Sequence, residues 1–239
     1  MKKILLLPIT VILVFLATVT KAQDEGSLWA SAVGGLNSNW IIFQNAYGNP
    51  ETEYSTTFGL TGGLGVSYFF TDTWGFNGSL LTTKMGQNYN GIQSGGEADR
   101  RVKLTYLELP LLFMKRGPYS PNPTWVSFGP DIFILLRANQ EYSRKGGTDL
   151  PFPDYMVSGN IRERYKPFDI GLQFAVNKMY HMQASDKLIF LVSFNSALGL
   201  TDINDKDWQI PQRDGTYKGS HNFYIGMKVG LMFDLTKGK

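Results

Sequence analysis

The chain has 239 residues, no cysteine, and nearly balanced charges of 23 Lys and Arg against 20 Asp and Glu. The balance leaves no basic excess that would indicate nucleic-acid binding. The missing cysteines exclude disulfides, thiol catalysis, thiolate metal sites and a lipid-modified N-terminal cysteine.

The first predicted element is a secretory signal peptide over residues 1–22. Two lysines precede an apolar run from Ile4 to Val19, and Thr20-Lys21-Ala22 places small residues where a signal peptidase cleaves. An uncleaved membrane anchor is the alternative, which the basic start, a proline within the run and the small-residue exit disfavour. We expect cleavage before Gln23 and a single domain over 23–239. No later stretch is apolar and long enough for a membrane helix, so a membrane crossing would use strands.

The clearest strand pattern runs from Phe58 to Phe70. Every second residue, starting with Phe58, Leu60 and Gly62, belongs to a mainly large and apolar set, whereas the residues between are mostly Gly, Thr and Ser. A period of two indicates a strand. Small residues inside and bulky residues outside are typical of a narrow closed barrel whose outer wall contacts lipid.

The same alternation predicts eight strands along the chain. The first, from Leu28 to Asn37, has two faces rich in alanine and glycine, and its facing stays open. The other predicted strands are Phe58–Phe70, Trp74–Met85, Val102–Lys115, Trp125–Ala138, Phe168–Asn177, Leu188–Thr201 and a last strand after Ser220 that includes Phe223–Asp234.

The connections between these strands alternate long and short. Long loops are expected at 38–56, 86–100, 139–167 and 202–220, and short turns at 71–73, 117–123 and 178–186. Short periplasmic turns and long outer loops are the rule in outer-membrane barrels. The predicted fold is therefore all-β, an eight-stranded antiparallel up-and-down transmembrane β-barrel in the outer membrane of a Gram-negative cell.

A family resemblance supports this fold. The segment Tyr106–Leu112 resembles the tyrosine, leucine, glutamate, aliphatic, proline motif of PorT-type outer-membrane β-barrel proteins, and Gly129-Pro130, Phe168–Gly171 and Leu198–Ile203 also look like that family. The resemblance covers essentially the whole mature chain. It implies an outer-membrane, porin-like barrel, and its best-known member is linked to a secretion system that exports surface proteins.

No set of residues indicates catalysis, a cofactor or a metal site. The two histidines are His181, with no ligand-type neighbour, and His221, beside Ser220. Lipid A-modifying barrels of this size use a histidine and a serine near the outer rim, but adjacent strand residues face opposite sides. We expect no enzyme. A small conducting pore is the other alternative, although eight strands leave an interior just wide enough for side chains.

A structural or binding role of the outer loops is the remaining interpretation. Trp40, Ile41 and Phe43 form an apolar run in a predicted loop, and Trp208 with Ile210 repeats this in the last loop. These residues are candidate contacts for a protein partner, or else strand extensions that contact lipid headgroups. The expected partners are outer-membrane lipid and lipopolysaccharide, with no nucleic acid, and the expected state is a monomer.

The interior is predicted to hold a polar layer. Glu108, Asp131, Asp169 and Lys228 take the inward phase at a similar distance from the short turns. Buried ions must be paired or hydrogen-bonded. We therefore expect Arg137, also in the inward phase, to reach this layer, and Gln173, Asn195 and Tyr224 to donate hydrogen bonds, which together would plug the lumen. Pro110 and Pro130 are candidate bulge positions, where the phase would reverse.

Overall fold

A computed structural model describes residues 26–43, 52–117, 124–149, 156–182, 188–209 and 215–236. The predicted signal peptide and Ile210 lie outside these ranges. The described part contains ten strands and two short 3₁₀ helices, η2 (Arg162–Arg164) and η3 (Lys206–Trp208). The strands are β1 (Ser27–Ile42), β2 (Thr52–Ser55), β3 (Phe58–Phe69), β4 (Trp74–Gln93), β5 (Gly96–Arg116), β6 (Thr124–Lys145), β7 (Gly159–Asn160), β8 (Phe168–His181), β9 (Leu188–Gly199) and β10 (His221–Asp234).

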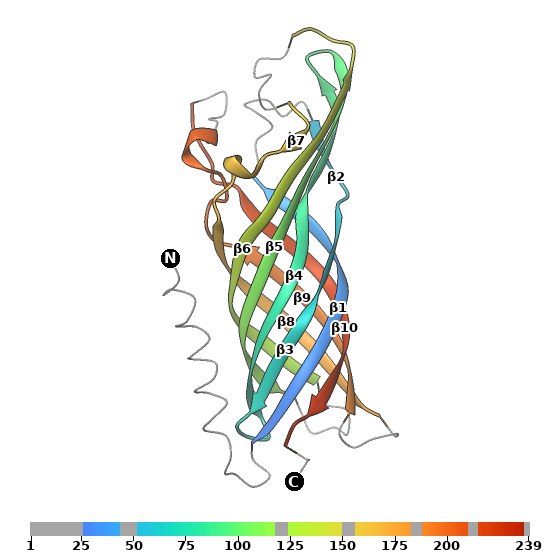
Figure 1. Cartoon of the computed structure of the whole chain (residues 1–239), viewed down its shortest axis with the longest axis vertical. Helices are drawn as coiled ribbons and strands as arrows, with labels where there is room; N and C mark the ends of the chain where they lie inside the picture. Colours follow the sequence, from blue (N-terminus) through green and yellow to red (C-terminus); the bar gives the residue numbers. More distant parts are fainter. Residues whose placement is uncertain are drawn as a thin grey trace.

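The long strands close into a ring. Neighbours in the chain pair antiparallel from β3 through β4, β5, β6, β8 and β9 to β10. The ring closes because β1 pairs with both β3 and β10. The short strands β2 and β7 pair with β4 and β6 outside this ring. Figure 1 shows a tall barrel, and the prediction of a closed antiparallel all-β fold is confirmed.

The outer wall of the ring is apolar and its inner wall is small or polar. In β3, Phe58, Leu60 and Leu64 are 65%, 58% and 67% exposed, whereas the adjacent Gly59 and Gly65 are buried. The predicted facing of the later strands is likewise confirmed over most of their length. In β1, whose facing the sequence left open, Trp29, Ser31 and the following odd-numbered residues point inward.

Three strands rise beyond the ring at one end, which corrects two predicted loops. Residues 86–100 are not a loop, because β4 continues to Gln93 and turns into β5 through Ser94 and Gly95. Both turn residues have positive φ, 48° and 76°, as a tight hairpin turn of two residues requires. β6 likewise continues to Lys145. We call this part of β4, β5 and β6 the projection (Figure 1).

Two predicted loop contacts belong to a strand. β1 extends to Ile42, so Trp40 and Ile41 lie in the wall of the barrel rather than in a loop. Ile41 is fully buried in the interior, and the Trp40 ring packs 5.5 Å from that of Phe223 on the neighbouring strand β10. Their predicted place in a loop is wrong, and the alternative of a strand extension describes them, because one residue of the run faces the lumen and the other faces outward.

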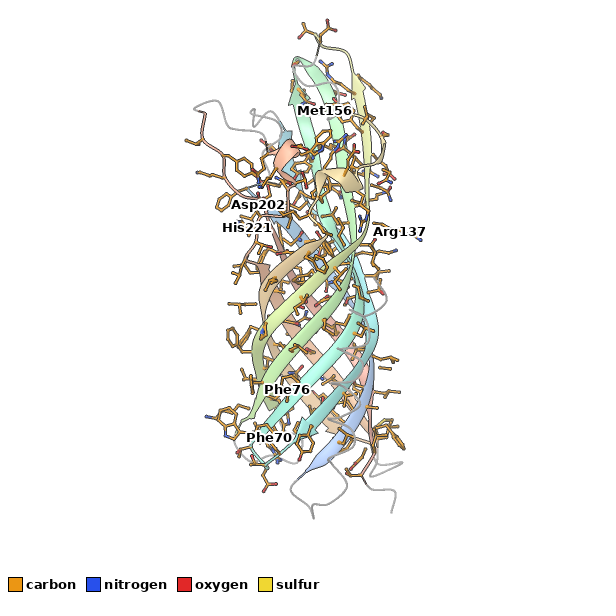
Figure 2. All side chains as sticks on the ribbon, turned by 60° about the vertical axis from the view of Figure 1, so that its left-hand side comes forward. Phe70, Phe76, Arg137, Met156, Asp202 and His221 are labelled. Atoms are coloured by element: carbon orange, nitrogen blue, oxygen red, sulfur yellow. The ribbon has the colours of Figure 1, made fainter. Side chains whose placement is uncertain are left out.

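A β-bulge reverses the predicted facing of Arg137. Thr105 pairs with Arg137 but Tyr106 pairs with Leu135, so Leu136 is an extra residue in β6. Leu136 and Arg137 both face outward as a result. The irregular backbone is satisfied by a neighbouring segment, because Leu135 N–H donates to the Pro167 carbonyl and the Leu135 carbonyl accepts from Arg162. Arg137 is exposed, and its predicted place in the lumen is wrong (Figure 2).

The interior consists of two apolar clusters with polar side chains between them. The cluster nearer the short turns contains Trp29, Met114, Trp125, Met179, Ile189, Leu191 and Met232. The cluster at the other end includes Ile41, Leu104, Tyr106, Phe133, Leu135, Ile161, Tyr165, Ile203 and Tyr224. Ile161, Tyr165 and Ile203 come from the connections outside the ring, so these connections close the mouth of the barrel.

Candidate functional site: the barrel lumen

A hydrogen bond crosses the lumen between strands on opposite sides of the ring. Tyr224 of β10 donates from its hydroxyl to Oε1 of Glu108 on β5, at 2.7 Å, and both side chains are fully buried. Separate paths of pairing, through β1, β3 and β4 or through β9, β8 and β6, lead from β10 to β5. The side chains therefore bridge the barrel at its full width.

A row of hydroxyls continues this bridge along the wall. The Thr83 hydroxyl on β4 donates to Oε2 of Glu108, and the Thr61 hydroxyl on β3 lies 2.7 Å from that of Thr83. Both carboxyl oxygens of Glu108 thus have a donor, which is how a buried carboxyl group is stabilised. Residues from β3, β4, β5 and β10 are joined in one chain of contacts.

A second bridge lies nearer the mouth that Ile161, Tyr165 and Ile203 close. Asn222 of β10 donates from Nδ2 to the Tyr106 hydroxyl on β5 at 3.1 Å and to Oδ2 of Asp169 on β8 at 3.0 Å. The Thr201 hydroxyl donates to Oδ1 of Asp169 at 2.7 Å. Asp169 faces the interior as predicted, and its partners are Asn222 and Thr201 rather than a lysine or arginine.

The remaining predicted layer residues face inward without forming the expected pairs. Asp131 is fully buried, and within the described residues no donor has hydrogen-bond geometry to either of its oxygens. Its electrostatic neighbours are Glu108 and Lys228, but no ion pair within 4.0 Å involves Lys228 in the described ranges. Gln173 and Asn195 are buried, and neither donates to a carboxyl group there.

Lys228 and Gln173 line a small cavity on the side of this layer toward the short turns. The cavity has a volume of about 60 Å³, and its floor includes Met114, Met179, Leu191 and Met232 of the lower apolar cluster. One water needs roughly 10–15 Å³ of such space. The cavity can therefore hold a few waters for the buried polar groups.

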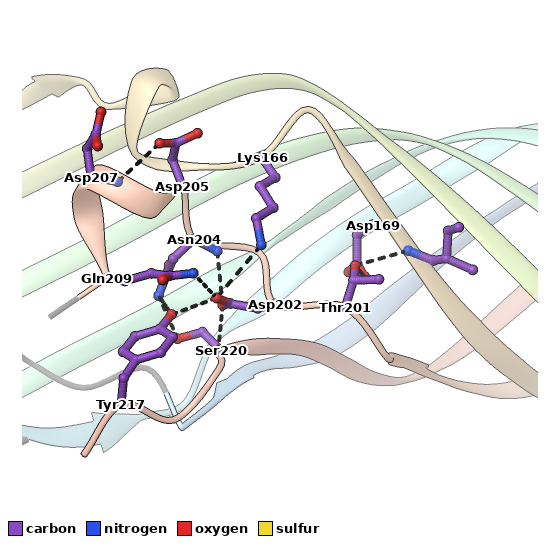
Figure 3. A network of polar contacts seen from close by, with 11 residues as sticks. Lys166, Asp169, Thr201, Asp202, Asn204, Asp205, Asp207, Gln209, Tyr217 and Ser220 are labelled. Atoms are coloured by element: carbon purple, nitrogen blue, oxygen red, sulfur yellow. Dashed lines mark hydrogen bonds and ion pairs between the residues drawn. The ribbon is translucent and has the colours of Figure 1, made fainter. Parts of the chain in front are cut away.

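A second polar network, which sequence reasoning missed, surrounds Asp202 above the ring (Figure 3). Its carboxylate accepts hydrogen bonds from Ser220 N–H at 2.9 Å, from the Tyr217 hydroxyl at 2.8 Å and from Gln209 Nε2 at 2.8 Å. Burial raises the pKa of the Tyr217 phenol above its usual range. The spacing of Asp202 and Asn204, whose N–H also donates to Asp202, is the one local signal for this turn.

Of the predicted loop contacts, Phe43 and Trp208 do lie outside the ring. Phe43 directly follows β1, is 55% exposed, and has Lys218 Nζ 5.8 Å from its ring centroid. Trp208 ends η3, and the Arg164 guanidinium lies over its ring at 4.6 Å. Arg164 is buried, so Trp208 is held to the loop structure around it.

The described residues give no support to a serine–histidine pair. The buried Ser220 hydroxyl accepts from Asn204 Nδ2 at 2.9 Å, and His221 begins the next strand with the opposite facing. Within the described ranges no group of three His, Cys, Asp or Glu residues could hold a metal ion. No helix in the described part is long and apolar enough to cross a membrane.

Comparison with known proteins identifies the family of the chain. A family model described as outer membrane protein beta-barrel domain matches residues 21–205. No curated protein matches the sequence.

Three similar solved structures are distant in sequence. Neisserial surface protein A has a TM-score of 0.44 at 10% identity, over 89% of this chain and 100% of its own. The outer membrane protein OprG from Pseudomonas aeruginosa has a TM-score of 0.44 at 10% identity, over 87% and 96%. Ail, the attachment invasion locus protein of Yersinia pestis, solved with the heparin analogue sucrose octasulfate, has a TM-score of 0.39 at 12% identity, over 87% and 99%. These scores lie below 0.5 and carry no functional information.

Proposed function

The chain belongs to the outer membrane protein beta-barrel domain family, and from this premise we propose that it is an integral outer-membrane protein with a side-chain-plugged lumen. In this proposal the signal peptide at 1–22 directs export, and the ring of eight long strands spans the membrane. The projection and the connections around Asp202 face the outside of the cell. The protein acts through these outer parts, in a structural or binding role, and not by conducting solutes or by catalysis.

The hydrogen bond between Tyr224 and Glu108 is the observation that carries this proposal. It crosses the full width of the ring, and apolar clusters fill the lumen on both sides of it. A solute would have to displace both clusters and leave buried polar groups without their hydrogen-bond partners, at about 1–3 kcal/mol for each group. An eight-stranded ring has no spare width for a path around them.

The apolar outer wall supports the membrane location. Phe113, Phe168 and Phe194, from three different strands, are 60%, 58% and 61% exposed. A soluble protein rarely exposes so large a contiguous apolar surface. A band of this kind around a barrel is expected where the wall contacts lipid over a height of roughly 25 Å.

Two measurements test the proposal. The folded protein in detergent should migrate faster on an unheated gel than after boiling, as barrels do, and single-channel recording in planar bilayers should show no steady unitary conductance. A variant with Tyr106, Tyr224 and Phe133 all replaced by alanine is the positive control for an opened lumen. Large, steady conductance of the unaltered protein would support a small porin-like channel instead.

Phe43 is the position at which partner binding is tested, because its side chain is more than half exposed, unlike those of Trp40, Ile41 and Trp208. Replacing Phe43 with serine should reduce capture of an outer partner by whole cells, whereas Trp40→Phe, a conservative change within the wall, should not. A role in secretion or surface assembly rests only on the resemblance to PorT-type proteins at Tyr106–Leu112 and the other motifs that carry it. Unchanged lipid A in cells that carry His221→Ala would agree with the absence of catalysis.

A further inference from the structure

Four cationic side chains gather on the outer wall just above the apolar band. Lys84 of β4, Arg101 and Lys103 of β5, and Arg137 of β6 are all exposed, and they come from three adjacent strands. We call these four residues the cationic patch. Arg137 belongs to it only because the bulge at Leu136 turns it outward.

The strand register places these residues side by side. Lys84 and Arg137 are the two cross-strand partners of Thr105, one on each side. Lys103 and Arg101 lie on the same face of β5, two and four residues before Thr105 in the chain and closer to the tip of the projection. Neighbouring strands lie about 4.8 Å apart, and diagonal neighbours on one face about 7–8 Å. Lys84, Lys103 and Arg137 can therefore converge on one anionic group, and Arg101, four residues or roughly 13 Å along β5 from Thr105, can contact a second one.

The patch carries more positive charge than its acidic neighbours neutralise. Lys103 forms an ion pair with Glu141, in which both side chains are more than half exposed. Within the described residues no hydrogen bond or ion pair involves the side chains of Lys84 or Arg137. Asp99 lies further along β5 toward the tip. Within the described residues, Lys84 and Arg137, which directly adjoin the apolar band, thus have no carboxylate within ion-pair distance.

On other strands of the ring, the apolar outer wall ends in apolar side chains and not in cations. At the same end of the neighbouring strands, the outward residues are Phe58 of β3, Phe168 of β8 and Leu200 after β9, each more than half exposed. Figure 2 shows Arg137 on the outside of the ribbon, toward the end opposite Phe70.

We propose that the cationic patch binds the phosphate groups of a phosphorylated glycolipid of the outer leaflet, with the acyl chains along the apolar wall of β4, β5 and β6. The inference rests on the proposed function, because it needs the projection to face outward. The chemistry of the ligand follows from the wall: Leu80, Phe113 and Leu136 are exposed below the cations. A molecule that fits both parts must have an anionic head joined to hydrocarbon chains.

The test compares two charge-removal variants of the full chain in phosphatidylcholine nanodiscs. The patch variant carries Lys84→Gln, Arg101→Gln and Arg137→Gln. The control variant carries Lys145→Gln, Lys206→Gln and Lys218→Gln, which removes the same charge from exposed positions outside the patch. The probes are fluorescent lipid A with both phosphates and the same lipid after dephosphorylation.

The patch variant should bind the phosphorylated lipid about 100-fold more weakly than the unaltered protein, at about fivefold for each cation near an anionic surface. The control variant should bind the phosphorylated lipid within about twofold of the unaltered protein. The affinity for the dephosphorylated lipid should change by less than about twofold in the patch variant, because that lipid has no phosphate for the cations to bind. Equal binding of both lipids by the unaltered protein, or unchanged binding by the patch variant, would overturn the inference. Failure of the unaltered protein to insert would instead refute the proposed function.

Discussion

The bridge between Tyr224 and Glu108 makes a specific prediction about stability. Tyr224→Phe keeps the ring and its packing but removes the hydroxyl that donates to Glu108 at 2.7 Å. The carboxyl oxygen is then buried without this donor, because Glu108 is fully buried. A buried acceptor that loses its donor costs about 1–3 kcal/mol, so we expect a loss of this size in the free energy of unfolding.

A double-mutant cycle isolates the pair. Glu108→Gln keeps the size of the side chain but replaces one carboxyl oxygen by an amide group that donates, and it should also destabilise the barrel. In the Glu108→Gln background, Tyr224→Phe should cost less, with a coupling energy of about 1–2 kcal/mol. The measurement is reversible urea unfolding in lipid vesicles, followed by tryptophan fluorescence and by migration on unheated gels.

Tyr180→Phe is the matched control for this experiment. Tyr180 lies on the outer wall of β8, is 42% exposed and packs 6.5 Å from the ring of Phe190. Loss of its hydroxyl should change the stability by less than about 0.5 kcal/mol. The reasoning is refuted if Tyr224→Phe is no more destabilising than this control, or if the two lumen substitutions are simply additive.

Three further predictions concern the barrel wall and the polar network around Asp202. Gly63→Ala should destabilise the barrel by about 1–3 kcal/mol because its Cβ would lie 2.8 Å from the Leu81 Cα on β4, whereas Gly78→Ala, with a nearest contact of 3.6 Å, should fold normally in the same urea assay. Asp202→Ala should increase proteolytic cleavage within 200–220 without changing the migration of the barrel, because several donors lose their acceptor, and the exposed Asp207→Ala should not. Because burial raises the pKa of Tyr217 above its unfolded value of about 10, the network should keep its full stability below roughly pH 10 and lose it as the pH rises further. Proteolytic cleavage within 200–220 should therefore increase above roughly pH 10, and Tyr217→Phe should abolish that increase. The same increase in the variant would contradict the assignment of the pH dependence to Tyr217.

The sequence determined the class of fold and the direction of most side chains. The facing of a strand residue is a local property, because successive side chains alternate with a period of two whatever the strand pairs with. The series Phe58, Leu60, Leu64 against Gly59 and Gly65 therefore predicts the outer and inner wall without knowledge of any partner. The same period correctly places Glu108, Asp131, Asp169 and Lys228 inside.

Arg137 shows where this local rule ends. A single extra residue at Leu136 reverses the phase, and a bulge is defined by the pairing of one strand with its neighbour rather than by the strand alone. The strand β1 is similar, because Trp40 and Ile41 look like a loop until the pairing with β10 extends the strand through them. In the projection, the glycine-rich residues 86–100 read as a loop because their strands are held by one another and not by a continuous apolar wall.

Only the tertiary structure decided which polar groups meet. Tyr224 and Glu108 are separated by 116 residues and lie on opposite sides of the ring, so their contact depends on closure, on strand tilt and on register together. Asp169 is bound by Asn222 and Thr201 instead of a cation because these side chains reach it at that height of the lumen. A strand pattern specifies the face of a residue, but its position across a closed barrel is set by the pairing of all the strands between.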